Sequence, residues 1–352
     1  MSDVSRQTWI DSVKGINPRY INYDILRIAA CVGVVAMHVI SNYSWSFNGD
    51  ILRFEILNFP HTLTELAVPC FVMLSGALVL NSECTGDVSK FYKKTVKRLI
   101  IPTVVFGIIY SAYNLFTGMT LVQCAKKWIV DSPYYHLWYM YMIIGLYLLA
   151  PFIYKIKSRL KHLKLQFLFV IGAFVFSIIM RFAIKLPDIL RCFEHVGYFV
   201  AGGYIFEAYK KNDSIIKRKG IVILLFIIVF AIMIISNHLF VLQLIKKSAS
   251  EYYITDYLSP LIVFSAVAVF IAATDLNTDA YRNKAIIIKL SNYTFYIYLI
   301  HAGVLDVLNK VLSHLNISLN AITGIPIKIA VTLTVSYVGA MVINSSKRII
   351  NK

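Results

Sequence analysis

Residues 24–43 read DILRIAACVGVVAMHVISNY, a segment that is apolar over most of its length. About 20 such residues are needed for a helix to cross the hydrocarbon core of a bilayer, and backbone amides in lipid must be paired within the chain. Similar segments recur along the whole chain. They lie near residues 62–81, 99–118, 136–154, 165–184, 193–209, 220–240, 256–274, 286–306 and 325–345. The sequence therefore predicts an all-α, polytopic membrane bundle of about ten transmembrane helices.

Composition agrees with a membrane domain. The chain has 352 residues, of which 58% are hydrophobic and 15% are charged, and its mean hydropathy is +0.68. A soluble domain carries close to a quarter of charged residues. Because the apolar segments are spread evenly, we expect residues 1–352 to form one transmembrane domain.

Lysine and arginine predict the orientation of this domain. One set of polar stretches is densely basic: it comprises residues 90–98, 155–164 and 210–219, with Arg6, Lys14 and Arg19 before them and Lys347, Arg348 and Lys352 after them. The other set is sparse, with Arg53, Lys126, Lys127, Lys246 and Lys247. Dense positive charge faces the cytosol. The N-terminal segment 1–22 and the tail 346–352 are therefore both expected in the cytosol, which requires an even number of spans.

Several classes of protein are disfavoured by the same features. The net charge of +17 lies in short stretches between apolar segments, which indicates contact with anionic membrane lipid rather than with nucleic acid. The five cysteines are odd in number and fit no metal-binding spacing, so we expect no disulfide framework and no metal site. The first 22 residues are polar without a cleavage signature, which predicts that the first helix is retained as a signal anchor. A homo-oligomer is compatible with all of these features.

The first predicted helix carries three ionisable residues. His38 lies eleven positions after Arg27, which is about three full turns, so both side chains lie on one face about 16 Å apart along the axis. Asp24 lies one turn before Arg27 and can pair with it. Ionisable residues inside a span are costly and usually face the protein interior or a wet cavity.

This pair suits a long phosphorylated donor that enters from the cytosol. A guanidinium binds phosphate with two parallel hydrogen bonds, and an imidazole can take a proton from an attacking hydroxyl. The separation is comparable to an extended phosphopantetheine arm, so Arg27 and His38 could hold the two ends of acyl-coenzyme A. The alternative is that Arg27 extends to the membrane boundary and His38 is a hydrogen-bonded residue within the bundle.

With these motifs, the sequence resembles acyltransferase family 3, a family of integral membrane O-acyltransferases. Arg27, ten intervening residues and His38 match its first-helix pattern. Residues 68–76, VPCFVMLSG, resemble its second-helix signature, and residues 91–102, FYKKTVKRLIIP, resemble a basic loop leading into the third helix. Residues 135–139, YHLWY, resemble the branch that acetylates enterobacterial surface polysaccharide. Residues 197–203, GYFVAGG, and 296–301, YIYLIH, match later motifs in the same order.

The resemblance implies a bacterial inner-membrane enzyme that moves an acetyl group from cytosolic acetyl-CoA to a sugar hydroxyl of a cell-envelope glycan. The glycan would be of the O-antigen, enterobacterial common antigen or exopolysaccharide type, and acetyl-CoA would be a co-substrate with no cofactor bound permanently. Arg27 and His38 would be the essential pair, with Asp24 beside them. Lys94, Lys97 and Arg98 would bind the donor, although the family often has two arginines three residues apart where this chain has Lys94 and Lys97.

Other residues are expected on the acceptor side. His136 and His301 fall on the same outer side as His38, where they either bind the acceptor and support His38 or are interfacial histidines bonded to backbone or lipid. Trp138 and Glu65 are further acceptor-side candidates, whereas His61 is expected in an outer loop. The aromatic side chains of Tyr134, Tyr135, Trp138 and Tyr139 resemble an interfacial belt. Ser75 and Gly76 are expected to form a packing contact between helices.

Other mechanisms and functions compete with direct acetyl transfer. His38 could carry the acetyl group as an acyl-imidazole, or the bundle could pass the group to a separate transferase. The rival from another class is a polysaccharide exporter or other membrane transporter. The absence of a convincing internal repeat disfavours it, because many transporters are built from repeated halves.

Overall fold

The computed structural model describes residues 19–44, 51–184, 186–211, 219–244, 256–274, 276, 281 and 283–350, and every regular element in these ranges is helical. The elements are α2 (Ile21–Ser44), α3 (Ile51–Thr64), α4 (Ala67–Val79), η1 (Glu83–Thr85), α5 (Val88–Thr95), η2 (Val96–Ile100), α6 (Ile101–Phe116), α7 (Leu121–Val130), α8 (Trp138–Arg159), α9 (Leu163–Phe182), η3 (Asp188–His195), α10 (Val196–Lys210), α11 (Lys219–Leu244), α12 (Pro260–Thr274), α13 (Lys284–His314) and α14 (Ala321–Ile350). The predicted all-α, polytopic class is confirmed.

Seven helical stretches among the described residues are long and apolar enough to cross a bilayer. They are Ile21–Tyr43, Ile56–Val79, Val88–Phe116, Trp138–Arg159, Leu163–Phe182, Lys284–His314 and Ala321–Ser345, and two shorter apolar helices are Val222–Ser236 and Pro260–Thr274. The predicted span 193–209 divides into the end of η3 and the 15-residue α10. The count of ten therefore stays a prediction.

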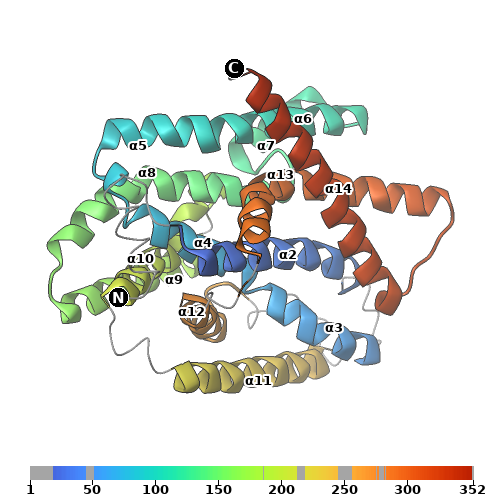
Figure 1. The fold of residues 1–352 in the computed structure, drawn as a ribbon. Coiled ribbons are helices and arrows are strands. Elements are labelled where there is room, and N and C mark those ends of the chain that lie inside the picture. The colour runs from blue at the N-terminus through green and yellow to red at the C-terminus, as the bar shows by residue number, and fades with distance from the viewer. Residues whose placement is uncertain are drawn as a thin grey trace.

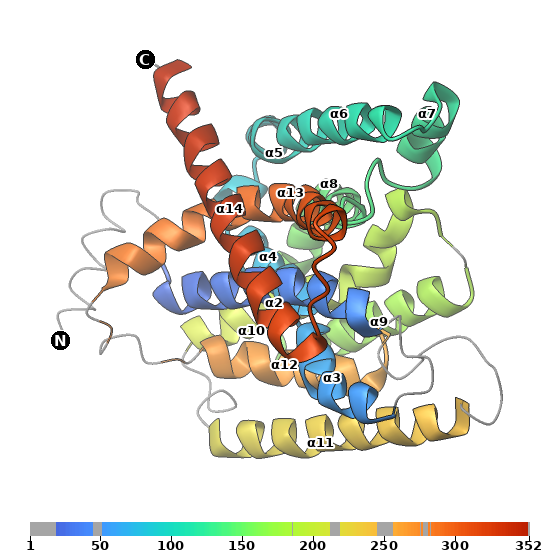
Figure 2. The ribbon, with the colours of Figure 1, turned by 90° about the vertical axis from the view of Figure 1, so that its right-hand side faces the viewer.

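Helix α2 lies in the middle of the bundle, with α6 and α11 at opposite edges (Figure 2). It contacts α3, α4, α12, α13 and α14, while α14 crosses the surface obliquely (Figure 1). Helix α13 runs parallel to α2, because its early residue Ser291 meets Asp24 and its later residue His301 meets His38. The helix that carries Arg27 and His38 is thus enclosed by other helices.

Glycines allow α4 and α10 to approach closely. A Cβ at Gly76 would lie 1.8 Å from the carbonyl oxygen of Phe199, and a Cβ at Gly202 would lie 1.9 Å from that of Met73. Small residues at such crossings let helix backbones touch in membrane proteins. The two sequence motifs that contain these glycines therefore form one packing unit, which supports the packing interpretation for Gly76.

Gly202→Ala is expected to lower the stability of the bundle. Overpacking a core costs about 1–3 kcal/mol, and here the added Cβ meets a backbone atom that cannot move unless the helices separate. The midpoint of thermal unfolding in detergent measures the effect. Gly172→Ala in α9 is the matched control, because no atom lies within 4 Å of its added Cβ. Equal midpoints for the two variants would contradict the packing argument.

Several segments predicted as loops are helical. Residues 91–102 lie within a continuous helix, Val88–Phe116, whose middle turn η2 is π-helical. The connection before α8, which was predicted to lie on the outer side, contains α7, which carries Lys126 and Lys127. His61 lies in the last turn of α3 rather than in a loop, and α14 continues to Ile350, into the predicted tail.

Some predictions concern residues outside the described ranges. These are the N-terminal residues 1–18 with Arg6 and Lys14, together with Lys217, Arg218, Lys246, Lys247 and Lys352.

Candidate functional site

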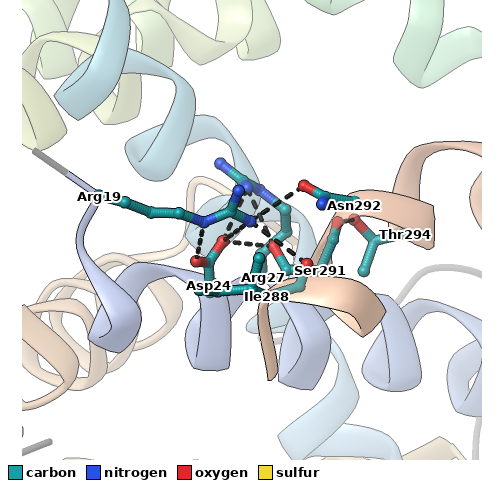
Figure 3. Close-up of polar contacts among 7 residues, drawn as sticks. All are labelled: Arg19, Asp24, Arg27, Ile288, Ser291, Asn292 and Thr294. Atoms are coloured by element: carbon teal, nitrogen blue, oxygen red, sulfur yellow. Dashed lines mark hydrogen bonds and ion pairs between the residues drawn. The ribbon is translucent and has the colours of Figure 1, made fainter. Parts of the chain in front are cut away.

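Asp24 organises the polar contacts at the start of α2. Arg19 binds its carboxylate through Nε at 2.7 Å and Nη2 at 3.1 Å, and Ser291 Oγ donates to Oδ1 at 2.5 Å. Arg27 Nη1 lies 3.3 Å from the same Oδ1 and donates to Ser291 Oγ at 3.1 Å (Figure 3). The predicted Asp24–Arg27 pair is therefore present. Asp24 accepts from several donors, which suits a role in positioning Arg27 better than a role as a base.

Arg27 lines two adjoining cavities. The inner cavity has a volume of about 170 Å³, and its wall includes Ser75, Tyr139 and Tyr298. The second has a volume of about 560 Å³ and shares Arg27 and Tyr147 with the first. The guanidinium side chain is 28% exposed. It thus lies where the two cavities meet and stays accessible to a ligand that enters either of them.

The larger cavity is lined by basic residues at the end that the positive-inside pattern assigns to the cytosol. Lys94 of α5 and Arg98 of η2 line it, and so does Lys210 at the end of α10. Lys97, which the sequence placed in the same cluster, is exposed and does not line this cavity. Lys210 was missed by the sequence reasoning as a cavity residue, although it belongs to the predicted basic stretch 210–219.

Three imidazoles from separate elements meet at the other end of α2. The ring centroids of His38 and His301 are 5.3 Å apart, and those of His136 and His301 are 5.1 Å apart. The structure thus brings together the three histidines that the sequence placed on one side of the bilayer. Their catalytic or binding roles stay predictions.

The hydrogen bond made by His301 defines which of its ring nitrogens carries the proton. Its Nδ1 lies 2.6 Å from the carbonyl oxygen of Tyr298, and a carbonyl can only accept, so Nδ1 carries the proton. Nε2 of the neutral ring is then an acceptor, and it is buried without a hydrogen-bond partner. Both ring nitrogens of His136 are also buried without a partner. The cluster therefore holds proton acceptors that no group of the protein occupies.

Tyr298 lies between the inner cavity and the imidazoles. Its side chain lines the cavity, and its ring centroid is 5.5 Å from those of both His136 and His301. The hydroxyl donates to the backbone carbonyl of His136. One aromatic layer thus separates the cavity beside Arg27 from the histidine cluster.

The predicted interfacial belt is wrong for Tyr134. This side chain is 5% exposed, its ring stacks on Tyr110 with centroids 4.2 Å apart, and its hydroxyl donates to Asp306. Desolvation and the Asp306 carboxylate raise its pKa. Tyr135 keeps an exposed side chain and makes an edge contact with His38 at 5.2 Å. The segment before α8 therefore forms one wall of the histidine cluster, with Tyr134 buried and Tyr135 exposed.

Trp138 and Glu65 lie near a second group of charged residues. The Arg191 guanidinium lies 5.2 Å from the Trp138 ring, and Tyr257 stacks on that ring. Glu65 pairs with His61 at 3.6 Å. Arg181, Glu194, His195 and Asp256 complete this group, and sequence reasoning missed them. The crowding of charged residues near residue 190 was a signal for Glu194 and His195, but not for Arg181 or Asp256.

No group of three or more His, Cys, Asp or Glu side chains within the described ranges could hold a metal ion. All five cysteines are free thiols. The candidate site is therefore built from a guanidinium, imidazoles and aromatic walls.

The family model described as an acyltransferase domain matches residues 20–341. A probable poly-beta-1,6-N-acetyl-D-glucosamine export protein of Staphylococcus epidermidis is 24% identical over 343 residues, which cover 90% of this chain and 92% of that protein. A protein of the same name from Staphylococcus aureus is 22% identical over 353 residues, covering 90% and 94%.

An amino-acid racemase of Enterococcus faecalis is 26% identical over 227 residues, which cover 56% of this chain but only 30% of that longer protein. No solved structure matches. The domain match extends from before Asp24 to beyond His301, so it includes the cavities and the histidine cluster. The chain belongs to the membrane acyltransferase family defined by this domain, and it is a multi-pass membrane protein.

Proposed function

We propose that this acyltransferase is an O-acetyltransferase that moves the acetyl group of acetyl-CoA to a hydroxyl of a cell-envelope glycan. One observation carries the proposal: Arg27 lies where a cavity with a basic lining adjoins a second cavity, and that second cavity ends at Tyr298, whose ring contacts two of the three clustered imidazoles. The positions of the anion-binding and proton-accepting groups match the two ends of a phosphorylated thioester.

The donor enters from the cytosolic end in this proposal. Lys94, Arg98 and Lys210 attract the phosphates of coenzyme A, and Arg27 binds a phosphate or the polar pantetheine arm deeper in the cavity. The arm extends past Ser75 and Tyr139 toward Tyr298, so the thioester reaches the aromatic layer next to the imidazoles. Lys97 has no direct role, because it lies outside the cavity lining.

His38 acts as the general base. The acceptor oxygen forms a bond to the acyl carbon, the thioester C–S bond breaks, and His38 takes the hydroxyl proton and returns it to the coenzyme A thiolate. His301 supports His38, because its Nε2 is an acceptor within the same cluster. Direct transfer requires proximity and one positioned base, so the reaction proceeds without a permanently bound cofactor.

The proposed location is the bacterial inner membrane, with both chain ends in the cytosol. Basic residues on the α5 and α10 side support this orientation. The acceptor then reaches the histidine cluster from the opposite side of the membrane. A lipid-linked or surface glycan of the O-antigen, enterobacterial common antigen or exopolysaccharide type meets this requirement.

Glycan export is the second candidate, and the names of the staphylococcal relatives favour it. An exporter requires a continuous path that alternates between the two sides, and it does not turn over acetyl-CoA. The basic cavity beside Arg27 favours the transferase, because an exporter has no need of a site for a phosphorylated acyl donor.

Deletion of the gene, followed by mass spectrometry of the envelope glycan, tests the proposal. The expected result is loss of O-acetyl mass with unchanged chain length, and the purified protein should consume acetyl-CoA only in the presence of the acceptor glycan. Accumulation of untransported chains, with the acetyl mass intact, would instead establish export and exclude the transferase.

A further inference from the structure

A small polar cavity lies at the outer ends of α8, η3 and α12. Its volume is about 50 Å³, enough for more than one water-sized group. Its carboxylates are more buried than its arginines, with the Glu194 and Asp256 side chains 5% and 12% exposed. The Arg181 and Arg191 side chains are 39% and 33% exposed. The cavity therefore has acidic acceptors at its floor and arginine donors at its rim.

The charges of this cavity compensate one another. Arg181 binds Asp256 at 2.8 Å and lies 3.6 Å from Glu194, while Arg191 binds Asp188 at 2.9 Å. A free anion would meet the two buried carboxylates, and a cation would compete with two arginines already in place. The electrostatics thus favour a neutral ligand.

His195 adds a buried acceptor with no partner. Its side chain is 2% exposed and lines the cavity. Nδ1 lies 3.0 Å from the carbonyl oxygen of Arg191, so it carries the ring proton, and Nε2 is left as an acceptor with no hydrogen-bond partner. Burying a polar atom without a partner is costly. A ligand that donates a hydrogen bond to Nε2 would remove that cost.

Tyr257 connects this cavity to the proposed catalytic histidines. It lines the cavity, stacks on Trp138, and its hydroxyl contacts the sulfur of Met37 at 3.6 Å. Met37 immediately precedes His38. A chain of sugars with one residue in the cavity could therefore extend along this wall toward the histidine cluster.

We propose that this cavity binds the hydroxyl edge of a neutral pyranose of the acceptor, with the rest of the ring at the rim, so that hydroxyls donate to Glu194, Asp256 and His195 Nε2. The inference rests on the proposed function for the identity of the acceptor. Hydroxyl groups are the best partners for this lining, because its buried polar groups are mainly hydrogen-bond acceptors and its positive and negative charges nearly balance. The cavity selects and holds the acceptor, and the transfer chemistry takes place at His38.

Binding of three methyl glycosides, measured by saturation-transfer NMR on the detergent-solubilised protein without acetyl-CoA, tests this subsite. The probes share a ring and differ in charge: methyl β-glucoside, methyl β-glucuronide and methyl β-glucosaminide. We expect the neutral probe to bind most tightly. Glu194→Gln and His195→Phe should each weaken it by about 10- to 100-fold, the effect of losing a hydrogen bond to a charged or otherwise unpartnered group.

Glu207→Gln is the matched control, because Glu207 is also an ion-paired carboxylate but binds Lys157 and Lys211 in a different cavity. It should leave glycoside binding unchanged. In transfer assays, the Glu194 and His195 variants should raise the KM for the glycan and keep the KM for acetyl-CoA. Unchanged glycoside binding in both variants, or tighter binding of a charged probe, would exclude this cavity as a subsite for a neutral sugar. Because binding is measured without the donor, a protein that binds glycoside but never transfers acetyl overturns the proposed function instead.

Discussion

His38→Ala should lower kcat for acetyl transfer by about 10²–10⁴-fold, the range that a positioned general base contributes. The substitution removes one imidazole of the cluster, whose ring centroid lies 5.3 Å from that of His301, and leaves the donor cavity beside Arg27 intact. The Kd for acetyl-CoA should therefore stay near its wild-type value. Initial rates on purified protein and a separate binding titration with coenzyme A measure the two effects.

His162→Ala is the matched control, since His162 is an exposed N-cap histidine at α9 with no capping hydrogen bond. It should leave both kcat and Kd unchanged. A folded His38→Ala protein that acetylates at the wild-type rate would exclude His38 as the base. Labelled acetyl that stays on wild-type protein but not on His38→Ala would replace direct transfer with an acyl-imidazole route.

The residues that local periodicity can place were predicted well from the sequence. Helical spacing is sufficient to put Asp24 beside Arg27, and span direction is sufficient to put His38, His136 and His301 on one side. The sequence could not show that α13 packs parallel to α2, because that depends on contacts between segments more than 250 residues apart, such as Ser291 with Asp24.

The predicted donor-binding segment is not a regular α-helix. Lys94, Lys97 and Arg98 share a face of an ideal α-helix, but η2 is a π-helical turn with i→i+5 hydrogen bonds. In this segment Lys94 and Arg98 line the cavity, whereas Lys97 lies outside its lining. Such π turns are frequent at functional sites, yet the sequence carries no simple pattern for them.

The charged outer cavity was missed for a different reason. Its residues come from α8, α9, η3 and the segment before α12, and no short motif contains all of them.

The position of Tyr134 was predicted wrongly, because an aromatic residue at the end of a span resembles an interfacial anchor until its partner is known. Asp306, which accepts from Tyr134, lies 172 residues away in the chain.

Arg27→Gln should raise the Kd for acetyl-CoA by about 10- to 100-fold, because it removes a charge-assisted contact to the donor. The fold should survive, since Asp24 keeps Arg19 Nε at 2.7 Å and Ser291 Oγ at 2.5 Å. Coenzyme A titration by calorimetry, with the unfolding midpoint as a check, measures the change. Lys97→Ala is the control from the neighbouring basic segment, and it should bind normally because Lys97 lies outside the cavity lining. If Arg27→Gln binds as tightly as wild type, the donor does not occupy this cavity.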